Sequence, residues 1–403
     1  GILAAVSACT SPGGKILMAR NCHKAVYHAA YLRQLETIYL YPSREVEMGL
    51  NGGISPKEVE TALEQHSDIQ AVVITSPTYD GILSDVKSIA QAAHRHRVPL
   101  IVDEAHGAHL PFHECFPKSA LYQGGDLVIQ SLHKTLPSLT QTAVIHRQSD
   151  LVSGERLERF LGIYQTSSPS YVLMASMAAC LRYLEEEGKQ AFDRYVFRLE
   201  QCRERLGQMR NLYLPGKEIR GQGNIFDLDQ SKILISGAGT GTEGPVLHRI
   251  LREKYGLEME MEAPGYVLAL TSVMDTEEGL ERLIQALEGI DTVLDQENGA
   301  KNGIHGKIIP SFEKYPEKLR PRQKMSIAQA MESEMEERDL ERSAEEISGE
   351  FAYLYPPGIP LLAPGEVISR EFIKRAGRWQ EQGLELQGLA DHSLKKIRIV
   401  KGK

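Results

Sequence analysis

The stretch Asp126-Leu127-Val128-Ile129-Gln130-Ser131-Leu132-His133-Lys134 decides the fold. Its apolar first half predicts a short buried strand, and its second half places a lysine where that strand ends. A second stretch of the same kind, Pro99-Leu100-Ile101-Val102-Asp103-Glu104-Ala105-His106, ends in an acid at the same relative place. Ligands of open α/β sheets bind beyond the carboxyl ends of the strands, so the two stretches predict one site that contains Asp103 and Lys134.

An acid and a lysine in this arrangement are what pyridoxal 5'-phosphate chemistry requires. The lysine holds the cofactor aldehyde as a Schiff base, and the acid pairs with the pyridinium nitrogen. A poorly solvated, cation-rich pocket lowers the pKa of a lysine and so favours its nucleophilic amine. We therefore predict Lys134 as the Schiff-base lysine and Asp103 as the partner of the ring nitrogen. The alternatives are a solvated surface lysine and an acid that caps a helix or joins a salt bridge.

Four stretches together resemble a known family, the ornithine/lysine/arginine decarboxylases, which are fold type I pyridoxal phosphate enzymes. Their order and spacing match across essentially the whole chain. The resemblance implies an α/β large domain of the fold type I transferase kind with a mixed, mostly parallel sheet, a small α+β domain and a C-terminal decarboxylase domain. The matching stretches are Arg20-Asn21-Cys22-His23-Lys24, Asp103-Glu104-Ala105-His106-Gly107-Ala108-His109, Ser131-Leu132-His133-Lys134-Thr135-Leu136-Pro137-Ser138-Leu139-Thr140-Gln141, and Tyr355-Pro356-Pro357-Gly358-Ile359-Pro360 through Pro364-Gly365-Glu366.

The resemblance also assigns roles around the cofactor ring. It implies that His23 stacks on the face of the ring, although a histidine at that place could simply cap its helix. His106 would lie beside the same ring, and Ala105 is small enough to let the ring lie flat against the strand end. Further cofactor contacts are expected from Ser131 and His133 to the phosphate, and from Ser76 and Thr78 to the ring hydroxyl.

For the substrate, the resemblance places Glu366 near the distal end of a basic amino acid, in its own or in a neighbouring active site. Thr166, followed by Ser167 and Ser168, is a similar candidate at a subunit interface. The expected partners are a small basic amino acid and further copies of the chain, in a homodimer or a larger homo-oligomer with active sites at the interface.

The start of the chain carries a further expectation. In the resembled family, a Gly-Ser/Thr loop that cradles the cofactor phosphate comes just before a segment equivalent to Gly1-Ile2-Leu3-Ala4, and this chain begins after that loop. Phosphates commonly bind backbone N–H groups at such helix N-termini. We therefore expect either a fragment of a longer gene product or weak cofactor binding. Residues 1–10 themselves predict a core helix and not a secretory signal.

Composition narrows the possible partners. The 403 residues are 42% hydrophobic and 25% charged, which is typical of a globular protein of two or three domains. The net charge of -8 argues against nucleic acid as the main partner. The five cysteines form no C-x-x-C pair, so a reducing cytoplasm is the simplest setting. No apolar run approaches the roughly 20 residues that span a bilayer, so we expect no membrane.

Strand and helix patterns alternate as in βαβ units and suggest three domains, at 1–213, 214–297 and 298–403. The large domain predicts strands at 15–20, 69–75 and 141–146 besides the two quoted above, and helices at 23–35, 55–66, 84–96, 150–161, 170–187 and 188–209. The second unit predicts strands at 232–236, 257–263 and 265–271, helices at 244–255 and 276–294, and a linker at 297–309.

Three other patterns suggest different functions. Gly239-Thr240-Gly241-Thr242-Glu243-Gly244 matches G-x-G-x-x-G and keeps a nicotinamide dehydrogenase open as an alternative. The strand that follows alternates polar and apolar residues as an antiparallel strand does, which disfavours dinucleotide binding. His106, His109, His113 and Cys115 could bind zinc on one helix, but Pro111 would break that helix, so we expect no metal. The acidic run from Met331 to Glu350 predicts a solvated helix face.

The sequence therefore predicts decarboxylation of arginine, lysine or ornithine to agmatine or a diamine, with pyridoxal 5'-phosphate as cofactor. Arginine or lysine is slightly favoured as substrate. An aminotransferase uses the same cofactor chemistry and stays open, because fold alone does not exclude it. A catalytically impaired fragment also stays open.

Overall fold

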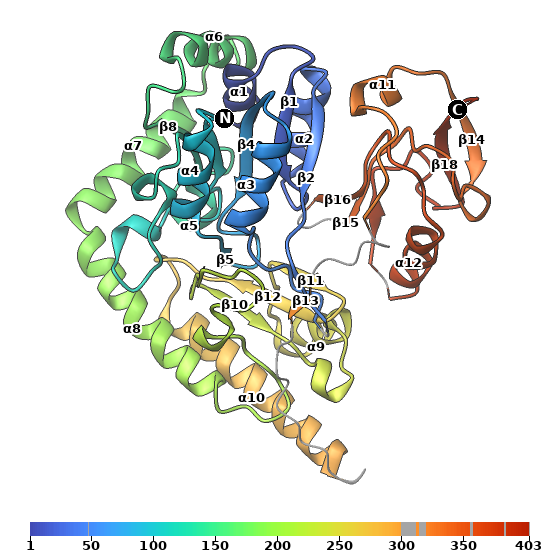
Figure 1. Cartoon of the computed structure of the whole chain (residues 1–403). Coiled ribbons are helices and arrows are strands. Elements are labelled where there is room, and N and C mark those ends of the chain that lie inside the picture. Colours follow the sequence, from blue (N-terminus) through green and yellow to red (C-terminus); the bar gives the residue numbers. More distant parts are fainter. Residues whose placement is uncertain (47, 300–311, 314–319, 355–357, 383, 403) are drawn as a thin grey trace.

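The structure is a computed structural model that describes residues 1–46, 48–299, 312–313, 320–354, 358–382 and 384–402. A six-stranded sheet in the order β2-β1-β4-β6-β7-β8 forms the large domain (Figure 1). Neighbouring strands run parallel except the pair β7 and β8, which is antiparallel. This confirms the predicted α/β fold with a mixed, mostly parallel sheet. The strands are β1 (Lys15–Ala19), β2 (Glu36–Leu40), β4 (Ile69–Thr75), β6 (Leu100–Asp103), β7 (Leu127–Ser131) and β8 (Ala143–Arg147).

Helices surround this sheet in two groups. Helix α1 packs with α2 and α6, and α3 packs with α4. Local signals set where they begin: Ser55 caps α3 by accepting from the Glu58 amide, and Asp85 caps α4 by accepting from the Ser88 amide. The helices are α1 (Ile2–Cys9), α2 (Lys24–Leu32), α3 (Pro56–Gln65), α4 (Val86–Arg95), α5 (Leu132–Thr135), α6 (Gly154–Tyr164), α7 (Tyr171–Glu186) and α8 (Gly188–Leu206).

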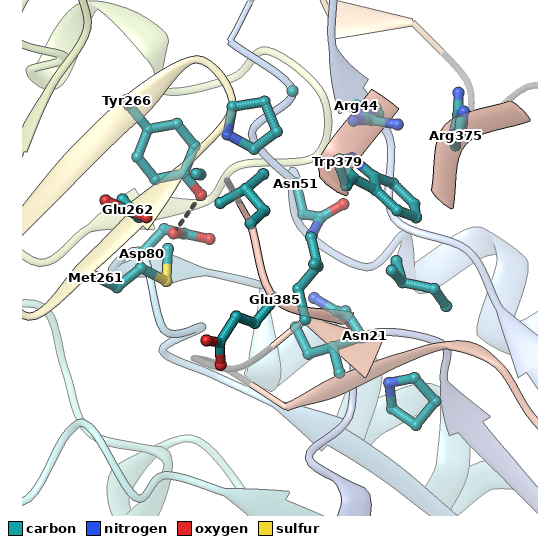
Figure 2. Close-up of a pocket in the computed structure, with 18 of the residues that line it drawn as sticks. Asn21, Arg44, Asn51, Asp80, Met261, Glu262, Tyr266, Arg375, Trp379 and Glu385 are labelled. Carbon is teal, nitrogen blue, oxygen red and sulfur yellow. Dashed lines mark hydrogen bonds between the residues drawn. The ribbon is translucent and has the colours of Figure 1, made fainter. Parts of the chain in front are cut away.

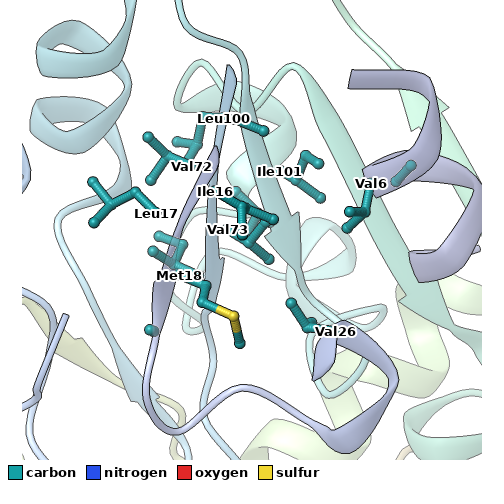
Figure 3. Close-up of a cluster of buried hydrophobic side chains, with 14 of the residues drawn as sticks. Val6, Ile16, Leu17, Met18, Val26, Val72, Val73, Leu100 and Ile101 are labelled. Atoms are coloured by element: carbon teal, nitrogen blue, oxygen red, sulfur yellow. The ribbon is translucent and has the colours of Figure 1, made fainter. Parts of the chain in front are cut away.

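The core of the large domain lies between the sheet and its helices. Side chains of β1, β4 and β6 meet those of α1 and α2 there (Figure 3). All four residues of β6 are buried, as expected for a parallel strand that is covered on both faces. This core fixes the carboxyl ends of β4, β6 and β7, which carry the predicted site. The side chains labelled in Figure 3 are Val6, Ile16, Leu17, Met18, Val26, Val72, Val73, Leu100 and Ile101.

The second unit is a three-stranded antiparallel sheet in the order β10-β12-β11. Its strands and helices share a hydrophobic core with α7 and α8. Since β10 and β12 run antiparallel, the G-x-G-x-x-G stretch between β10 and α9 does not lie in a parallel dinucleotide-binding unit. The elements are β10 (Lys232–Ile235), α9 (Gly244–Tyr255), β11 (Met261–Ala263), β12 (Tyr266–Leu270) and α10 (Glu277–Gly299); β5 (Ile82–Leu83) pairs with β9 (Asp227–Leu228) nearby.

The C-terminal unit lies at one side of the large domain in Figure 1. Two small antiparallel sheets, β14 with β18 and β16-β15-β17, form its frame. Its elements are α11 (Ile327–Met331), β14 (Met335–Asp339), β15 (Ala352–Leu354), β16 (Ile359–Leu362), α12 (Arg370–Glu381), β17 (Leu386–Gln387) and β18 (Lys396–Val400). The short strand β13 (Phe312–Glu313) pairs with β3 (Arg44–Glu45). Short 3-10 helices are η1 (Leu110–Phe112), η2 (Ala120–Tyr122), η3 (Lys217–Ile219), η4 (Ala238–Thr240) and η6 (Leu340–Arg342).

Some predicted elements differ from the observed ones. The acidic run was predicted as a helix face, but it contains strand β14. Glu337 of β14 pairs with Lys396 of β18, and Glu334, just before β14, pairs with Lys401, just after β18. Strand β2, at the edge of the sheet, was not predicted. Helix α10 continues through Gly299 into the predicted linker, and the rest of that linker lies outside the described residues. Tyr355, Pro356 and Pro357, from one of the stretches that carry the family resemblance, also lie outside the described residues.

No helix in the described ranges is both long enough and apolar enough to cross a membrane.

Candidate active site

A cavity of about 620 Å³ opens at the carboxyl ends of β4, β6 and β7. Its volume is within the range of pockets that hold cofactors and small ligands. Seven of the predicted site residues line it: His23, Asp103, Ala105, His106, Ser131, His133 and Lys134. Residues that were not predicted line it as well, among them Asn21, Thr75, Tyr79 and Glu260.

Lys134 lies on α5, the short helical turn that directly follows β7. Its Nζ is 2.9 Å from Nε2 of His106 and 5.9 Å from the centre of the Tyr79 ring. Burial lowers the pKa of the Lys134 ammonium, and the nearby Asp103 carboxylate opposes this shift. Lys134 therefore has the environment that an amine nucleophile requires.

Asp103 ends β6, and its side chain is 3% exposed. Its Oδ1 accepts from the Ala105 amide at 3.1 Å, and it forms no salt bridge with any residue that the structure describes. Burial raises the pKa of the carboxyl group, and Lys134 opposes this shift. A cationic partner such as a pyridinium nitrogen would compensate for the burial of a carboxylate here.

His23 has two roles at once. It caps α2, because its Nδ1 accepts from the Ala25 amide at 3.2 Å, and its ring lines the cavity. Burial lowers the pKa of His23 to about 4, and the positive charge of Lys134 adds to the shift. The ring is therefore neutral near neutral pH, with its proton on Nε2. A flat, neutral ring in this position suits stacking on a planar cofactor.

His106 lies between two lysines, which the sequence did not predict. Its Nε2 contacts Lys134, and its Nδ1 lies 3.1 Å from Nζ of Lys232, the first residue of β10. The Tyr79 ring packs on the imidazole with the ring centres 4.5 Å apart. Lys232 begins an apolar strand after Asp229-Gln230-Ser231. The signal that identified Lys134, a lysine after the end of a buried run, does not apply to Lys232, which stands at the start of its strand.

Three groups could hold the phosphate or the ring hydroxyl of a cofactor. Thr75 lines the cavity, and its buried hydroxyl, which lies beside the Cys22 thiol, has no nitrogen or oxygen partner among the described residues, so it can serve a ligand. Ser131 precedes α5 and also lines the cavity. Nδ1 of His133 lies 2.9 Å from the Thr142 carbonyl oxygen and donates to it. A contact from His133 Nε2 to a phosphate oxygen would then require the protonated ring. Together with Lys134 and Asp103, these residues fit pyridoxal phosphate.

Four predicted contacts do not line this cavity. The Ser76 and Thr78 hydroxyls accept from the backbone amides of Ser84 and Ile82, so their polar atoms serve the turn before β5. Thr166 lies on the exposed loop between α6 and α7. Glu366 is 1% exposed and is bound within the fold by Arg20.

A second cavity of about 490 Å³ adjoins the first (Figure 2). The two share Asn21, Glu260 and Ile359 in their linings. Figure 2 shows Arg44, Arg375, Trp379 and Glu385 around this space, with the Tyr266 hydroxyl donating to Asp80 at 2.7 Å. A ligand that starts at Lys134 could therefore extend toward a second, more polar chamber.

Glu260 stands at the junction of the two cavities. His248 binds the carboxylates on either side of it, Glu258 and Glu262. Glu260 has no salt bridge to any described residue, and its Oε1 accepts from the Tyr79 hydroxyl. Lys134 and Lys232 are near enough for the charge of Glu260 to raise their pKa values, but neither is in direct contact with its carboxylate.

The histidines and the cysteine considered as metal ligands have separate partners. His109 contacts Asp229 at 3.2 Å, His113 contacts Asp193 at 3.4 Å, and His106 contacts the two lysines. Pro111 lies in η1, where no long helix forms. Within the described ranges, no group of three or more His, Cys, Asp or Glu residues could hold a metal ion.

Comparison with known proteins gives consistent results. Residues 1–233 match the family described as "Orn/Lys/Arg decarboxylase, major domain", and residues 310–381 match "Orn/Lys/Arg decarboxylase, C-terminal domain". An arginine decarboxylase of Bacillus anthracis is 34% identical over 401 residues, which are 99% of this chain and 79% of the relative. An arginine decarboxylase of Bacillus subtilis is 32% identical over 403 residues, which are 99% of this chain and 80% of the relative.

Solved structures show the same fold. The constitutive lysine decarboxylase of Escherichia coli superposes with a TM-score of 0.77 at 21% identity, over 99% of this chain and 68% of that one. Lysine decarboxylase A from Pseudomonas aeruginosa superposes with a TM-score of 0.80 at 19% identity, over 99% of this chain and 68% of that one.

Proposed function

The chain belongs to the Orn/Lys/Arg decarboxylase family and is a carboxy-lyase, and from this premise we propose that it decarboxylates arginine to agmatine with pyridoxal 5'-phosphate bound to Lys134. The observation that carries this proposal is the meeting of three groups in one cavity: the Lys134 amine, the buried Asp103 carboxylate and the neutral His23 ring. Pyridoxal phosphate, when bound, supplies an electron sink for the bonding pair that carbon dioxide leaves behind.

The residues of the chain would bind the cofactor, hold protons at defined atoms and exclude water. Lys134 would bind the cofactor aldehyde covalently and would hold a proton close to the reacting carbon. Asp103 keeps the proton on the ring nitrogen, because a buried carboxylate without another cationic partner stabilises a pyridinium strongly. His23 covers one face of the ring and excludes water from it. Thr75 and Ser131 offer hydroxyls to the polar groups of the cofactor.

Glu260 supports a basic substrate. It lies on the wall of the Lys134 cavity, hydrogen-bonded to a tyrosine whose ring also packs near Lys134 Nζ. A guanidinium offers two parallel N–H donors to a carboxylate, which makes arginine a good fit for this position. The names of the most similar relatives favour arginine over lysine.

A homo-oligomer is part of the proposal. Helix α7 begins with three large apolar side chains that are mostly exposed: Tyr171 at 78%, Val172 at 68% and Met174 at 52%. An exposed apolar patch of this kind is typical of a protein interface. The loop with Thr166 directly precedes it, so a second copy would also cover that loop. Analytical ultracentrifugation should therefore give a mass above that of one chain.

The decisive experiment uses the purified protein with pyridoxal phosphate. Borohydride reduction followed by peptide mass spectrometry should place the pyridoxyl group on Lys134, and incubation with arginine should release carbon dioxide and agmatine. Keto-acid formation in place of carbon dioxide would indicate an aminotransferase. Release of carbon dioxide only from lysine or ornithine would change the substrate. A chain that is unlabelled at Lys134 would contradict the proposal.

A further inference from the structure

Lys232 is a buried lysine that forms no direct ion pair with any acid of the described chain. It is 2% exposed, and no carboxylate of the described chain lies within salt-bridge distance of its Nζ. Buried ammonium groups are normally paired, because their desolvation is costly. Instead, the polar contact of its Nζ is with Nδ1 of His106, at 3.1 Å. The turn before β5 holds the lysine stem, since a Cβ on Gly81 would lie 2.6 Å from Lys232 Cγ.

His106 limits how protons can be placed around it. Burial lowers the pKa of His106, as do the charges of Lys232 and Lys134, so the ring is neutral near neutral pH. A neutral imidazole has one N–H donor and one nitrogen lone pair, whereas an ammonium can only donate. Both lysines contact a ring nitrogen, so the two contacts can be hydrogen bonds only when one lysine donates and the other accepts. In that arrangement, one of the two lysines is a free amine.

We propose that His106 passes a proton between Lys134 and Lys232, so that Lys232 stores the proton that Lys134 must lose to become a nucleophile. The Nζ proton of Lys134 moves to Nε2 of His106, and the Nδ1 proton moves to Nζ of Lys232. The reverse transfers restore the first state. One proton enters and one leaves the ring, so the total charge of the three groups does not change.

The charges around the two lysines suit such a transfer. Lys134 faces Asp103, Glu260 and His23, and Lys232 faces Asp229, Asp80 and Glu260, with His109 bound to Asp229 on the same side. Burial lowers the pKa of Lys232 to about 8, although Asp229 opposes this shift. An amine with a pKa in this range can both take up and release a proton near neutral pH. Constant total charge also avoids desolvating a new charge in the site.

Lys232 is thus a positioning residue that acts on Lys134 through His106. The reaction of the Lys134 amine with the cofactor rests on the proposed function. The sharing of the proton between the two lysines does not, because it takes place in the chain without its cofactor. The test can therefore be made on cofactor-free protein, where failure of this inference and failure of the proposed function give different results.

Competitive acetylation with a trace of acetic anhydride, followed by mass spectrometry, measures the free-amine fraction of Lys134 at each pH. In Lys232→Met, no neighbouring amine can take the proton, so Lys134 should keep it. We expect Lys134 labelling near neutral pH to fall about tenfold, which equals one unit of higher apparent pKa. Lys24→Met is the control, because Lys24 Nζ lies over the Tyr353 ring of the C-terminal unit, 5.0 Å from the ring centre.

Equal Lys134 titration curves in wild type and Lys232→Met would overturn the inference, as would an equal shift in Lys24→Met. Methionine needs no buried partner, so folding should persist, and circular dichroism checks this.

A second measurement needs no change at Lys232. With ¹⁵N-labelled histidine, His106 should show both tautomers in exchange, its signals being assigned by their loss in His106→Phe. A single fixed tautomer across the titration would contradict proton transfer. Borohydride labelling of Lys134 tests the proposed function separately.

Discussion

Asp103 is the residue whose charge the proposed chemistry depends on most. Asp103→Asn keeps the shape of the side chain and removes the carboxylate that would hold a proton on the ring nitrogen. We expect the decarboxylation rate to fall about 100-fold or more, as when a preorganised electrostatic group is lost from an active site. Single-turnover measurements with saturating cofactor would separate this effect from weaker cofactor binding.

Asp126 supplies the control for this substitution. It is an equally buried aspartate at the opposite end of the sheet, where it contacts His94 and the Leu100 amide. Asp126→Asn should lower stability but leave the rate per folded molecule close to that of wild type. A similar loss of rate in both variants would mean that Asp103 acts only through the fold.

Glu260 offers a test of substrate recognition. Glu260→Gln removes the negative charge that is proposed to bind the distal cation and keeps the contact with the Tyr79 hydroxyl. We expect KM for arginine to rise about tenfold, equivalent to roughly 1.4 kcal/mol, with little change in kcat. Glu253→Gln, on the exposed side of α9, is the control. An unchanged KM would exclude Glu260 from the substrate site.

His23 predicts a pH dependence of stability. Its pKa is about 4 in the folded chain and 6.5 in the unfolded chain, so the unfolded chain binds the proton between these values. The stability contributed by the neutral ring is thus complete above pH 6.5 and is lost as the pH falls toward 4. In His23→Phe this loss should be smaller by about 2 kcal/mol. Urea unfolding of cofactor-free protein at several pH values measures the difference, and parallel pH profiles for both proteins would contradict the assignment.

At the residue scale, the sequence brought side chains to one cavity where they follow directly from a buried strand, and their roles there stay a prediction. Asp103 ends β6, and Lys134 lies on α5 directly after the neighbouring parallel strand β7, so the pairing of these two strands brings both residues to one edge of the sheet. Ser76 and Thr78 lie in a turn, where backbone amides compete for their hydroxyls, and the sequence does not show which partner wins. Glu260 was missed because its contact with Tyr79 joins segments far apart in the chain.

At the scale of elements, hydrophobic period and capping residues predicted most of the large domain. Strand β4 and helix α9 have the predicted bounds. Two of the errors have a common cause, since they involve strands with mixed or charged faces. Strand β2 lies at the edge of the sheet, where one side of the strand is not paired, and β14 is stabilised by pairing with β18, which is distant in the sequence.

Helix α9 shows why a G-x-G-x-x-G stretch can be structural. A Cβ on Gly244 would lie 1.9 Å from the Ala263 carbonyl oxygen, so the glycine lets the helix start against the turn between β11 and β12. Gly244→Ala should therefore destabilise the protein by about 2 kcal/mol or more. Gly377→Ala, in an open position on α12, should instead be neutral or stabilising by up to about 1 kcal/mol. Urea unfolding compares the stability of Gly244→Ala with that of Gly377→Ala. Equal unfolding midpoints for the two variants would contradict this explanation.

At the scale of the whole molecule, separate hydrophobic clusters lie in the large domain, around the second unit and in the C-terminal unit. The active-site cavity takes residues from all three parts, with Glu260 and Leu270 from the second and Ile359 from the third. The division into three domains, at 1–213, 214–297 and 298–403, stays a prediction from sequence patterns. The sequence did not predict how the three parts meet, because contacts between separately folded units leave no periodic signal in either partner.

One buried ion pair joins the large domain to the C-terminal unit. Arg20 lies 3.1 Å from Glu366, donates to the Pro360 carbonyl oxygen at 2.6 Å, and packs on the rings of Tyr27 and Tyr39. A partner lost from such a pair leaves an uncompensated buried charge, which costs about 3–5 kcal/mol, whereas loss of both partners costs much less. This gives Glu366 a structural role that the resemblance alone did not indicate.

A double-mutant cycle tests that role. We expect Arg20→Met and Glu366→Leu each to lower the free energy of unfolding by about 3–5 kcal/mol, and the double variant to be more stable than the sum of the two losses by about 2 kcal/mol or more. Urea unfolding followed by the signal of Trp379, which lies on α12 of the C-terminal unit, reports on this part of the chain. Additive losses would mean that Arg20 and Glu366 act independently, and Glu366 would then again be a candidate for substrate contact across a subunit interface.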